Sequence, residues 1–167
     1  MAGLELFQKW YNKIMKIVIQ KTKKEDINRL AQIYKRAYDR SGFGENWNVQ
    51  KATSLLRFYQ EQKNFVGVTA VADNKIVGAF FSYVKPWHDG NHLGEGELFV
   101  DPAYQNKKIG TKLFMEMMKI AKKKRCVIHE LVAYDRIARW YKKIGLKNSG
   151  LKHMTGNIGE ILKKVVI

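Results

Sequence analysis

Residues Glu97–Met118 read ELFVDPAYQNKKIGTKLFMEMM, and this stretch decides the fold of the chain. The apolar run Leu98–Val100 predicts a strand that ends at Asp101, because Pro102 has no amide to give to a sheet ladder. A polar, basic loop follows. After Thr111, apolar residues recur at spacings of three and four, which predicts one face of a helix. These residues are Leu113, Phe114, Met117, Ile120 and Ala121. The unit is therefore a strand, a basic loop and a helix.

The basic loop has two interpretations when its residues are taken alone. Free amides at the start of a helix attract anions, and the flanking lysines add full positive charge, so one interpretation is a phosphate-binding loop. The other is an ordinary strand-to-helix connection with solvated lysines. Both stay open at this level.

The loop residues Gln105–Gly110 resemble the pyrophosphate loop of the GNAT superfamily of N-acetyltransferases, which reads Arg/Gln-x-x-Gly-x-Gly/Ala. The resemblance implies acetyl-coenzyme A as co-substrate, with its pyrophosphate on the loop amides and its pantetheine arm along the backbone of Leu98–Val100. The cofactor residues that it implies are Leu98, Phe99, Val100, Gln105, Asn106, Lys107, Lys108, Ile109, Gly110 and Thr111. Lys108 stands where the pattern has its first glycine. If that position needs a glycine-type backbone, we expect strain of roughly 1 kcal/mol or more.

A second stretch, Tyr134–Leu146, is similar to the Asn-x-x-Ala-x-x-Phe-Tyr-x-x-x-Gly-Phe helix of the same superfamily. Its asparagine position is here Tyr134 or Asp135. The resemblance implies that the hydroxyl of Tyr141 protonates the departing thiolate of coenzyme A. From the residues alone, a ring packed on the core is the preferred interpretation of Tyr141. The two motifs occur in the order of the superfamily, and the resemblance covers about residues 16–166.

Transfer of an acetyl group to an amine also needs a base, because the amine is largely protonated at pH 7, and donors for the oxyanion, such as strand amides. Superfamily members commonly place a glutamate or histidine ahead of the pantetheine-pairing residues, where this chain has Glu95 and Glu97. Strand alternation puts both carboxylates on one face, opposite Gly94 and Gly96. A β-bulge would restore the usual geometry, or water would relay the proton to Glu95, Glu97 or His92. Glu97 is the first choice of base and Glu95 the second.

Two segments are candidate contacts of the acceptor. In the superfamily the loop between the first two helices helps to line the acceptor site, which implies Phe43, Glu45 and Trp47; aromatic clamps on the core are the alternative. A predicted loop at residues 85–92 would place Trp87 and His88 at the mouth of the same site. We expect no metal there, because the glycine between His88 and His92 disfavours a helical ligand pair and no cysteine is close in sequence.

The whole pattern predicts one mixed α/β (α+β) domain, residues 16–167, with a mostly antiparallel sheet of about seven strands and helices on both faces. Thr22 and Glu25 have the spacing of a capping box, and Asp73-Asn74 is a tight hairpin turn. Residues 1–15 are an N-terminal extension with a short amphipathic helical pattern. The expected strands are 16–20, 65–72, 75–84, 98–100, 126–133, 151–155 and 160–166. The expected helices begin near Thr22, at Val49, after Thr111 and at Asp135, the last being capped by Gly145. The first of them carries a helical stripe that we assign to the core: Ile27, Leu30, Ile33, Tyr34 and Tyr38.

Composition is typical of a globular protein, with 46% hydrophobic and 28% charged residues in a chain of 167. A single cysteine, Cys126, excludes an internal disulfide and fits a reducing cytoplasm. No apolar run has the length of a membrane span, and Glu5 and Lys9 interrupt any apolar core of a signal peptide. Homodimers are common among superfamily members, but no residue fixes the assembly here.

The formal net charge of +16 exceeds what one phosphate-rich coenzyme requires. A solvated lysine surface explains it, and so does weak contact with nucleic acid, which the coenzyme does not require. Such charge argues against polycationic acceptors unless their site is locally acidic.

Two functions stay open. One is an acyltransferase that moves the acetyl group of acetyl-coenzyme A to a primary amine by direct attack in a ternary complex. The other is a non-catalytic module, coenzyme A-binding or nucleic-acid-associated, on the same fold, which Gly94, Gly96 and Lys108 favour. These sequence patterns do not identify the acceptor amine.

Overall fold

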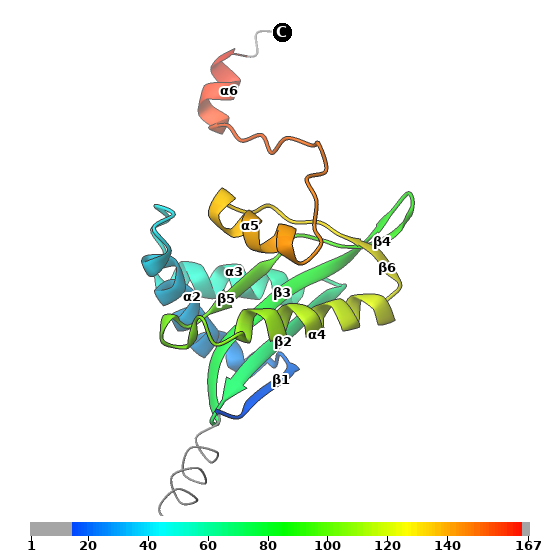
Figure 1. Cartoon of the computed structure of the whole chain (residues 1–167). Helices are drawn as coiled ribbons and strands as arrows, with labels where there is room; N and C mark the ends of the chain where they lie inside the picture. The colour runs from blue at the N-terminus through cyan, green and yellow to red at the C-terminus, as the bar shows by residue number, and fades with distance from the viewer. Residues whose placement is uncertain (1–14, 165–167) are drawn as a thin grey trace, which may run out of the picture. The chain divides into compact units, whose positions relative to one another are not determined.

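The structure, a computed structural model, describes residues 15–164 (Figure 1). The predicted N-terminal helical pattern, at residues 4–14, lies outside the described residues. The described residues up to Glu130 form one compact unit and those from Leu131 onward form a second, and each unit is described by itself.

The first unit is built on a mixed sheet. Over the described residues its strands are β1 (Ile17–Lys21), β2 (Phe65–Ala72), β3 (Lys75–Trp87), β4 (Gly90–Leu93), β5 (Glu97–Val100) and β6 (Cys126–His129). The order is β1-β2-β3-β4-β6, with β5 also paired to β3, and only β4 and β6 are parallel. The predicted mixed, mostly antiparallel sheet is confirmed, with a 6-stranded sheet where about seven strands were expected.

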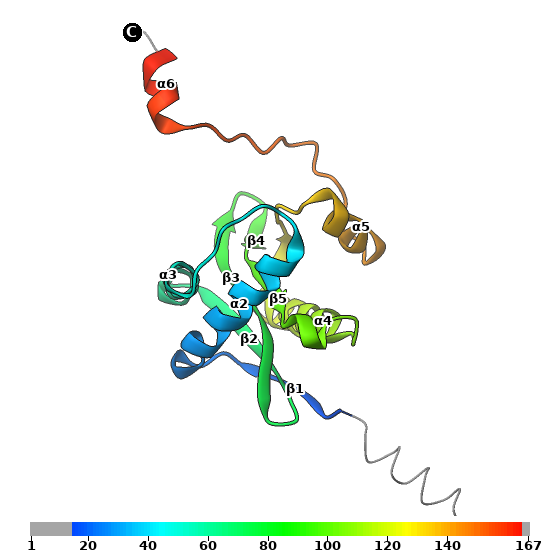
Figure 2. The same ribbon diagram turned by 90° about the vertical axis from the view of Figure 1, so that its left-hand side faces the viewer.

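Helices cover both faces of this sheet, as predicted. Successive strand residues point to opposite faces, so Phe80 and Phe81 mark the two sides. The helices α2 (Ile27–Ser41) and α3 (Val49–Glu61) pack in one buried cluster with Phe81. On the other face α4 (Ile109–Lys123) stacks Phe114 on Phe80, with ring centroids 6.1 Å apart. Figure 2 shows α2 and α3 on one side of the strands and α4 on the other.

The helical stripes read from the sequence are buried. Four of the five predicted residues of the α2 stripe are buried and Tyr38 is half-buried; four of the five of the α4 stripe are buried and Ile120 is half-buried. These stripes therefore supply the core on each face of the sheet. The buried members are Ile27, Leu30, Ile33 and Tyr34 in α2, and Leu113, Phe114, Met117 and Ala121 in α4.

The predicted cap of α2 is wrong. Thr22 is buried, and its hydroxyl lies 2.9 Å from the hydroxyl of Thr69 on β2. The chain then passes through a short 3-10 helix, η1 (Lys24–Asp26), where the amide of Lys23 donates to the Asp26 carboxylate at 3.0 Å. A buried hydroxyl needs a hydrogen-bond partner, and Thr69 on the neighbouring strand supplies it. Thr22 therefore does not cap a helix, and the hydrogen bond between Lys23 and Asp26 closes the first turn instead.

Two hairpins shape the long strand β3. The turn at Asp73 and Asn74, with φ of 47° and 63°, is the tight turn predicted from the sequence. The predicted loop at residues 85–92 is wrong, because β3 continues to Trp87 and pairs with β4 in a second hairpin. Pro86 does not interrupt β3. It lies beyond the last pairing of β3 with β2, where one edge of the strand is free and proline is tolerated.

A β-bulge separates β4 from β5. Val84 pairs with Leu93 and Phe81 pairs with Glu97, so three steps along β3 face four steps on the other strand. One extra residue in a strand is the definition of a bulge. A Cβ on Gly96 would lie 1.9 Å from the carbonyl oxygen of Phe81, so the backbones approach too closely there for any other residue.

The bulge leaves one edge of β5 open. The parallel pairing of β4 with β6 ends where Leu93 meets His129, and the amide of Glu130 donates to the Leu93 carbonyl at 3.0 Å. Among the described residues β5 pairs only with β3. The backbone groups of β5 that face away from β3 are therefore available to a partner in an extended conformation, apart from the Val100 carbonyl, which accepts from the Gln105 side chain.

The second unit contains α5 (Asp135–Lys143) and α6 (Ile158–Lys164), and Gly145 after α5 has the positive φ of a helix cap, 104°. The strands predicted at 151–155 and 160–166 are wrong, since the first stretch is irregular and α6 occupies most of the second. Asn157 favours α6, because its side-chain oxygen accepts a hydrogen bond from the Glu160 amide at 3.2 Å and so caps the first turn of the helix. Within residues 15–164, no helix has the length and apolar character to span a bilayer.

We expect Gly96→Ala to lower the free energy of unfolding by about 2 kcal/mol or more, because the added methyl overlaps the Phe81 carbonyl. Gly110→Ala is the matched control. Its Cβ would meet nothing nearer than Val100 Cγ2 at 4.0 Å, and a helical alanine gains roughly 0.5–1 kcal/mol over glycine. Urea denaturation of the two variants measures both effects. Equal stability of the two variants would contradict the bulge geometry.

Candidate active site

The loop that precedes α4 is held in place from α2. Asp101 accepts from the Ala103 amide at 3.1 Å and so caps the 3-10 helix η2 (Pro102–Tyr104). The other oxygen of the same carboxylate lies 2.5 Å from the Arg36 guanidinium of α2. Gln105 then donates its side-chain amide to the Val100 carbonyl at 3.1 Å. These contacts fix where β5 ends and where the loop begins.

The backbone of the loop alternates between left-handed and right-handed conformations. Asn106 and Lys108 have φ of 62° and 59°, whereas Lys107 has an ordinary negative φ. Lys108 is therefore in the left-handed conformation that glycine adopts most easily, at the cost of some backbone strain. Successive amides in such an alternating backbone form a concavity suited to an anion.

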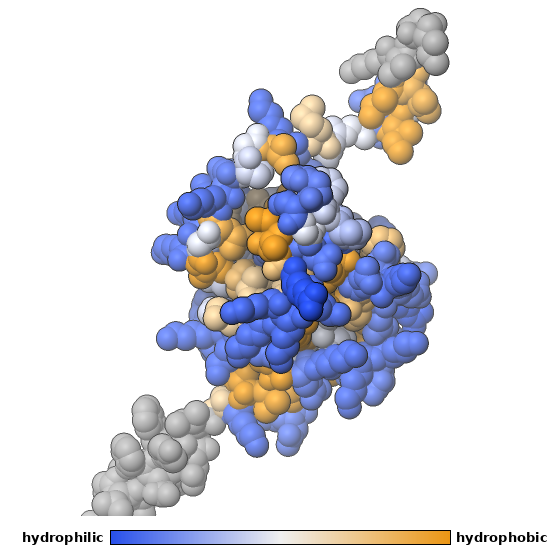
Figure 3. All heavy atoms as spheres, turned by 90° about the vertical axis from the view of Figure 1, so that its right-hand side faces the viewer, coloured by the Kyte–Doolittle hydropathy of each residue, from blue (hydrophilic) through white to orange (hydrophobic). Residues whose placement is uncertain are grey.

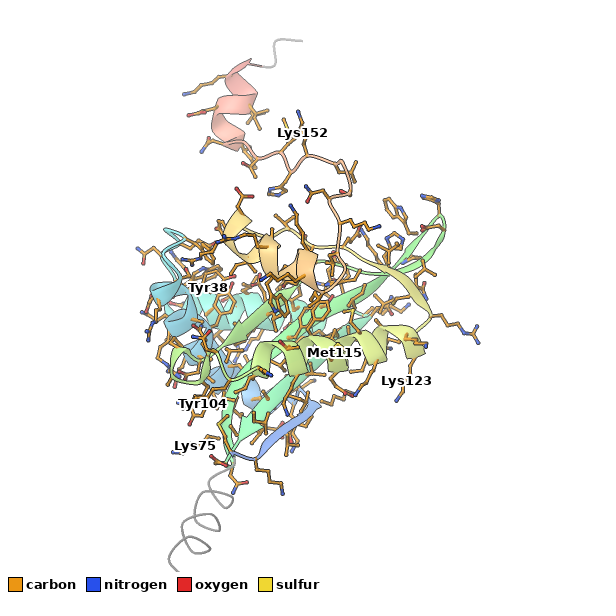
Figure 4. The ribbon with its side chains drawn as sticks, viewed as in Figure 1. Tyr38, Lys75, Tyr104, Met115, Lys123 and Lys152 are labelled. Carbon is orange, nitrogen blue, oxygen red and sulfur yellow. The ribbon has the colours of Figure 1, made fainter. Side chains whose placement is uncertain are left out.

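The first amides of α4 have no partner inside the helix. Its first helical bond runs from the Lys112 amide to the Lys108 carbonyl, 3.1 Å, which leaves the amides of residues 109–111 for an outside acceptor. The lysines of the loop are exposed, and the Lys107 ammonium lies 5.0 Å from the ring centroid of Tyr104, which Figure 4 labels in this loop. Free amides and three nearby cations, Lys107, Lys108 and Lys112, fit a phosphate group.

Glu97, at the start of β5, is held by two tyrosines of α2. The hydroxyls of Tyr34 and Tyr38 both donate to its Oε2, at 3.1 Å and 3.0 Å. The two rings stack with centroids 4.4 Å apart, and the Tyr34 ring also meets Phe99 edge-on at 5.1 Å. Two tyrosines one helical turn apart thus clamp one carboxylate oxygen.

Burial raises the pKa of Glu97 from its ordinary value of 4.5 to about 7. This value includes opposing effects of the hydrogen bonds from Tyr38 and Tyr34, which lower the pKa, and of repulsion from the Glu45 and Glu95 carboxylates, which raises it. The pKa values of both tyrosines are raised, first by burial and then by the charge of Glu97, so their hydroxyls stay protonated as donors. A carboxyl whose pKa is about 7 gives and takes protons at neutral pH.

Glu95 lies in a different environment from Glu97. It is exposed, whereas Glu97 is partly buried. The charges of both carboxylates raise the pKa of Tyr59 on α3. The bulge interrupts the alternation between them. His92 is buried, with Nε2 2.7 Å from the Asp89 carboxylate and Nδ1 3.7 Å from that of Glu130.

The predicted acceptor contacts divide into two groups. Phe43 and Trp47 gather around Tyr38, with ring centroids at 6.4 Å and 6.0 Å from it, and the Trp47 indole donates to Glu45 at 2.6 Å. Trp87 and His88 sit instead at the β3–β4 hairpin, where they and Pro86 line a hollow of ≈ 390 Å³. That hairpin is about 20 Å along β3 from Phe81, the partner of Glu97. In the described part of the chain, no three histidine, cysteine or acidic side chains are grouped to hold a metal ion.

Residues 27–146 match the sequence model of the Acetyltransferase (GNAT) family. The chain belongs to this family. Comparison with curated protein sequences finds no match.

Solved structures agree with the fold of this GNAT chain. A predicted acetyltransferase with acetyl-CoA from Clostridium acetobutylicum superposes with a TM-score of 0.70 at 20% identity, over 87% of this chain and 98% of that one. A possible acetyltransferase from Clostridium difficile 630 gives 0.71 at 16% identity, over 85% and 97%. Glucosamine-6-phosphate N-acetyltransferase from Arabidopsis thaliana gives 0.63 at 17% identity, over 86% and 99%.

Tyr141 belongs to the second unit of this GNAT chain. It lies on α5, half-buried, with its ring 4.8 Å from that of Trp140 in an edge-on contact. The Leu146 amide donates to its carbonyl at 3.1 Å, which closes the end of the helix. The catalytic role of Tyr141 stays a prediction.

The sequence interpretation missed the two tyrosines that hold Glu97. Tyr34 and Tyr38 were assigned to the core stripe of α2, and Tyr34 is indeed buried. Their spacing of one helical turn was the available signal, since paired hydroxyls on a core stripe must find an acceptor. Arg36, which fixes the cofactor loop through Asp101, left no such signal because its partner is distant in sequence.

We expect the stability of the protein to fall as pH rises from about 4.5 to about 7. The folded state holds the Glu97 proton up to the higher pKa, so over this window it binds more protons than the unfolded chain. Glu97→Gln removes the titration. Its stability relative to the parent should rise by about 3 kcal/mol between pH 4 and pH 8. Urea denaturation at several pH values measures the difference.

Glu95→Gln is the matched control for this experiment, because it changes an exposed carboxyl two positions away. Its stability should still fall with rising pH across this window, because Glu97 is unchanged. Parallel profiles for Glu97→Gln and the parent would mean that Glu97 does not titrate near neutrality.

Proposed function

We propose that this GNAT protein transfers the acetyl group of acetyl-coenzyme A to a primary amine, by direct attack within a ternary complex. One observation supports this proposal above the others. Glu97, a partly buried carboxyl held by two tyrosines, is the first residue of β5, and the outer edge of β5 is open among the described residues. The strand edge proposed to bind the coenzyme and the carboxyl proposed to accept the proton thus belong to the same strand of the first unit.

The coenzyme fits the groups that the first unit offers. The open edge of β5, residues Leu98 to Val100, would pair with the amide groups of the pantetheine arm. The unpaired amides of residues 109–111 and the loop lysines would hold the pyrophosphate. Bound there, the coenzyme supplies an activated acetyl group as a thioester.

Glu97 is the proposed general base. A primary ammonium gives its proton to the Glu97 carboxylate, and the freed nitrogen lone pair attacks the thioester carbonyl carbon. A base works best when its pKa is near the working pH, and the Glu97 pKa of about 7 meets this condition. Backbone amides at the bulge are the proposed donors for the developing oxyanion. As the carbon–sulfur bond breaks, Tyr141 gives its proton to the departing thiolate, and the nitrogen gives its second proton to the tyrosinate, which leaves the neutral amide and a free thiol.

The non-catalytic alternative has lost its main support. Gly94 and Gly96 suggested a missing catalytic residue, but close packing explains both. A Cβ on Gly94 would lie 2.8 Å from the Tyr83 ring, and one on Gly96 would overlap the backbone of Phe81. Lys108 adopts the backbone conformation of the glycine that it replaces. No observation favours a non-catalytic module.

Glu97→Gln should lower kcat/KM for acetyl transfer by about 100-fold, the usual contribution of a general base. In the parent, kcat/KM should rise with pH through an apparent pKa of about 7, and the variant should lose this step. Release of free thiol from acetyl-coenzyme A with a pool of amines measures both. If Glu95→Gln lost activity and Glu97→Gln kept it, the base would be Glu95.

Tyr141→Phe should lower kcat at least about tenfold and leave coenzyme affinity nearly unchanged, because it removes only the proton for the thiolate. Thiol release gives kcat, and calorimetric titration with coenzyme A gives the affinity. Tyr104→Phe makes the same chemical change at a tyrosine with no proposed role in proton transfer. Unchanged kcat in Tyr141→Phe would exclude the tyrosine from the mechanism.

A further inference from the structure

The short strand β5 is held at both ends by the same helix, α2. At the start of the strand, Tyr34 and Tyr38 donate their hydroxyls to Glu97 at 3.1 Å and 3.0 Å. Directly after the last residue of the strand, Asp101 accepts from the Arg36 guanidinium at 2.5 Å. Figure 4 labels Tyr38 on this helix. One helix thus contacts both the carboxyl proposed to accept the proton and the beginning of the loop proposed to bind the pyrophosphate.

Asp101 connects α2 to that loop through further hydrogen bonds. The residue is buried, and the carboxylate oxygen that does not meet Arg36 accepts from the Ala103 amide at 3.1 Å. The Asp101 carbonyl accepts from the Tyr104 amide at 2.8 Å, and the Tyr104 ring lies 5.0 Å from the Lys107 ammonium. A buried carboxylate is unfavourable unless a cation or several donors compensate its charge. Arg36 therefore stabilises the residue on which the turn η2 is built.

The loop is under strain in the conformation that it adopts. Asn106 and Lys108 both have left-handed backbones, although neither residue is glycine. Lys107, Lys108 and Lys112 also bring three positive charges to the free amides of residues 109–111, and like charges repel one another. Without the coenzyme, the loop would gain free energy by relaxing. A contact from outside the loop is therefore needed to keep its amides in place.

The net charge of the chain does not supply such a contact. The protein carries 31 lysine and arginine residues against 15 acidic ones. On the face shown in Figure 3, hydrophilic residues predominate and hydrophobic residues gather in separate patches. Positive charge distributed over many side chains attracts anions to the surface as a whole, but it does not orient backbone amides toward them. Orientation has to come from a short contact such as the one between Arg36 and Asp101.

We propose that Arg36 is a positioning residue for the coenzyme, because through Asp101 it holds residues 105–111 in the conformation that receives the pyrophosphate. The inference rests on the proposed function, which makes acetyl-coenzyme A the ligand of this loop. The pyrophosphate is bound alike before and during acetyl transfer. Loss of Arg36 should therefore raise KM for acetyl-coenzyme A and leave kcat nearly unchanged.

Arg36→Gln tests this role with two acetyl donors that carry the same thioester, acetyl-coenzyme A and S-acetylpantetheine. The second donor has no pyrophosphate and so makes no use of the loop amides. With a fixed pool of primary amines as acceptor, we expect kcat/KM for acetyl-coenzyme A to fall about tenfold or more, through KM. The value for S-acetylpantetheine should change by less than about twofold.

Arg29→Gln is the matched control, because Arg29 is an exposed arginine of the same helix whose guanidinium donates to Gln32 at 3.2 Å. It should leave kcat/KM unchanged for both donors. Equal losses with the two donors in Arg36→Gln would mean that Arg36 serves the fold as a whole, and this result would overturn the inference. No loss with either donor would overturn it as well.

Two further variants separate positioning from a general loss of stability. Arg36 meets Asp101 through Nη2, a contact that a lysine ammonium can also make. Arg36→Lys should therefore keep kcat/KM for acetyl-coenzyme A within about threefold of the parent. Combining Arg36→Gln with Asp101→Asn leaves no buried carboxylate without its cation, and the double variant should regain at least about threefold over Arg36→Gln. If neither variant exceeded Arg36→Gln, the ion pair would not be the cause.

A binding measurement separates this inference from the function on which it rests. If no amine releases thiol from acetyl-coenzyme A, the proposed function fails, but calorimetric titration with coenzyme A and with pantetheine still tests Arg36. In the parent, coenzyme A should bind more tightly than pantetheine, and Arg36→Gln should reduce the ratio of the two affinities about tenfold. Arg29→Gln should keep the ratio of the parent. An unchanged ratio in Arg36→Gln would overturn the inference, and a parent that does not bind coenzyme A would overturn both proposals.

Discussion

The extra residue between Leu93 and Glu97 is the constraint on which the first unit depends. Because four steps on this strand face three on β3, the sheet cannot stay evenly paired, and within residues 15–164 β5 has no strand neighbour on its other side. The same step interrupts the alternation of side chains, which places Glu97 against the tyrosines of α2 and leaves Glu95 exposed. A single feature of the backbone thus sets both the open edge and the position of the carboxyl. Gly96 is required because no side chain fits at this approach.

The placement of Glu97 lowers the stability of the folded protein when its carboxyl is charged. A carboxyl with a pKa of about 7 is held in surroundings that disfavour its charge, and the repulsion from two further carboxylates adds to this. The left-handed Lys108 in the cofactor loop is a second such position. Proteins keep unfavourable arrangements of this kind where function requires them, and the rest of the fold offsets them. Here the buried stripes of α2 and α4 on the two faces of the sheet provide that support.

Local patterns predicted most of the fold, and contacts between distant residues account for the errors. The helical stripes and the hairpin at Asp73 needed only neighbouring residues, and they were placed correctly. The cap at Thr22 failed because its hydroxyl meets Thr69, far along the chain. The strands predicted at 151–155 and 160–166 were wrong. A short alternating segment is a weak sign of a strand, and here Asn157 caps a helix instead. At the site, the motif identified the loop and the two candidate carboxylates. It did not show which of them is buried, since that depends on the bulge and on α2.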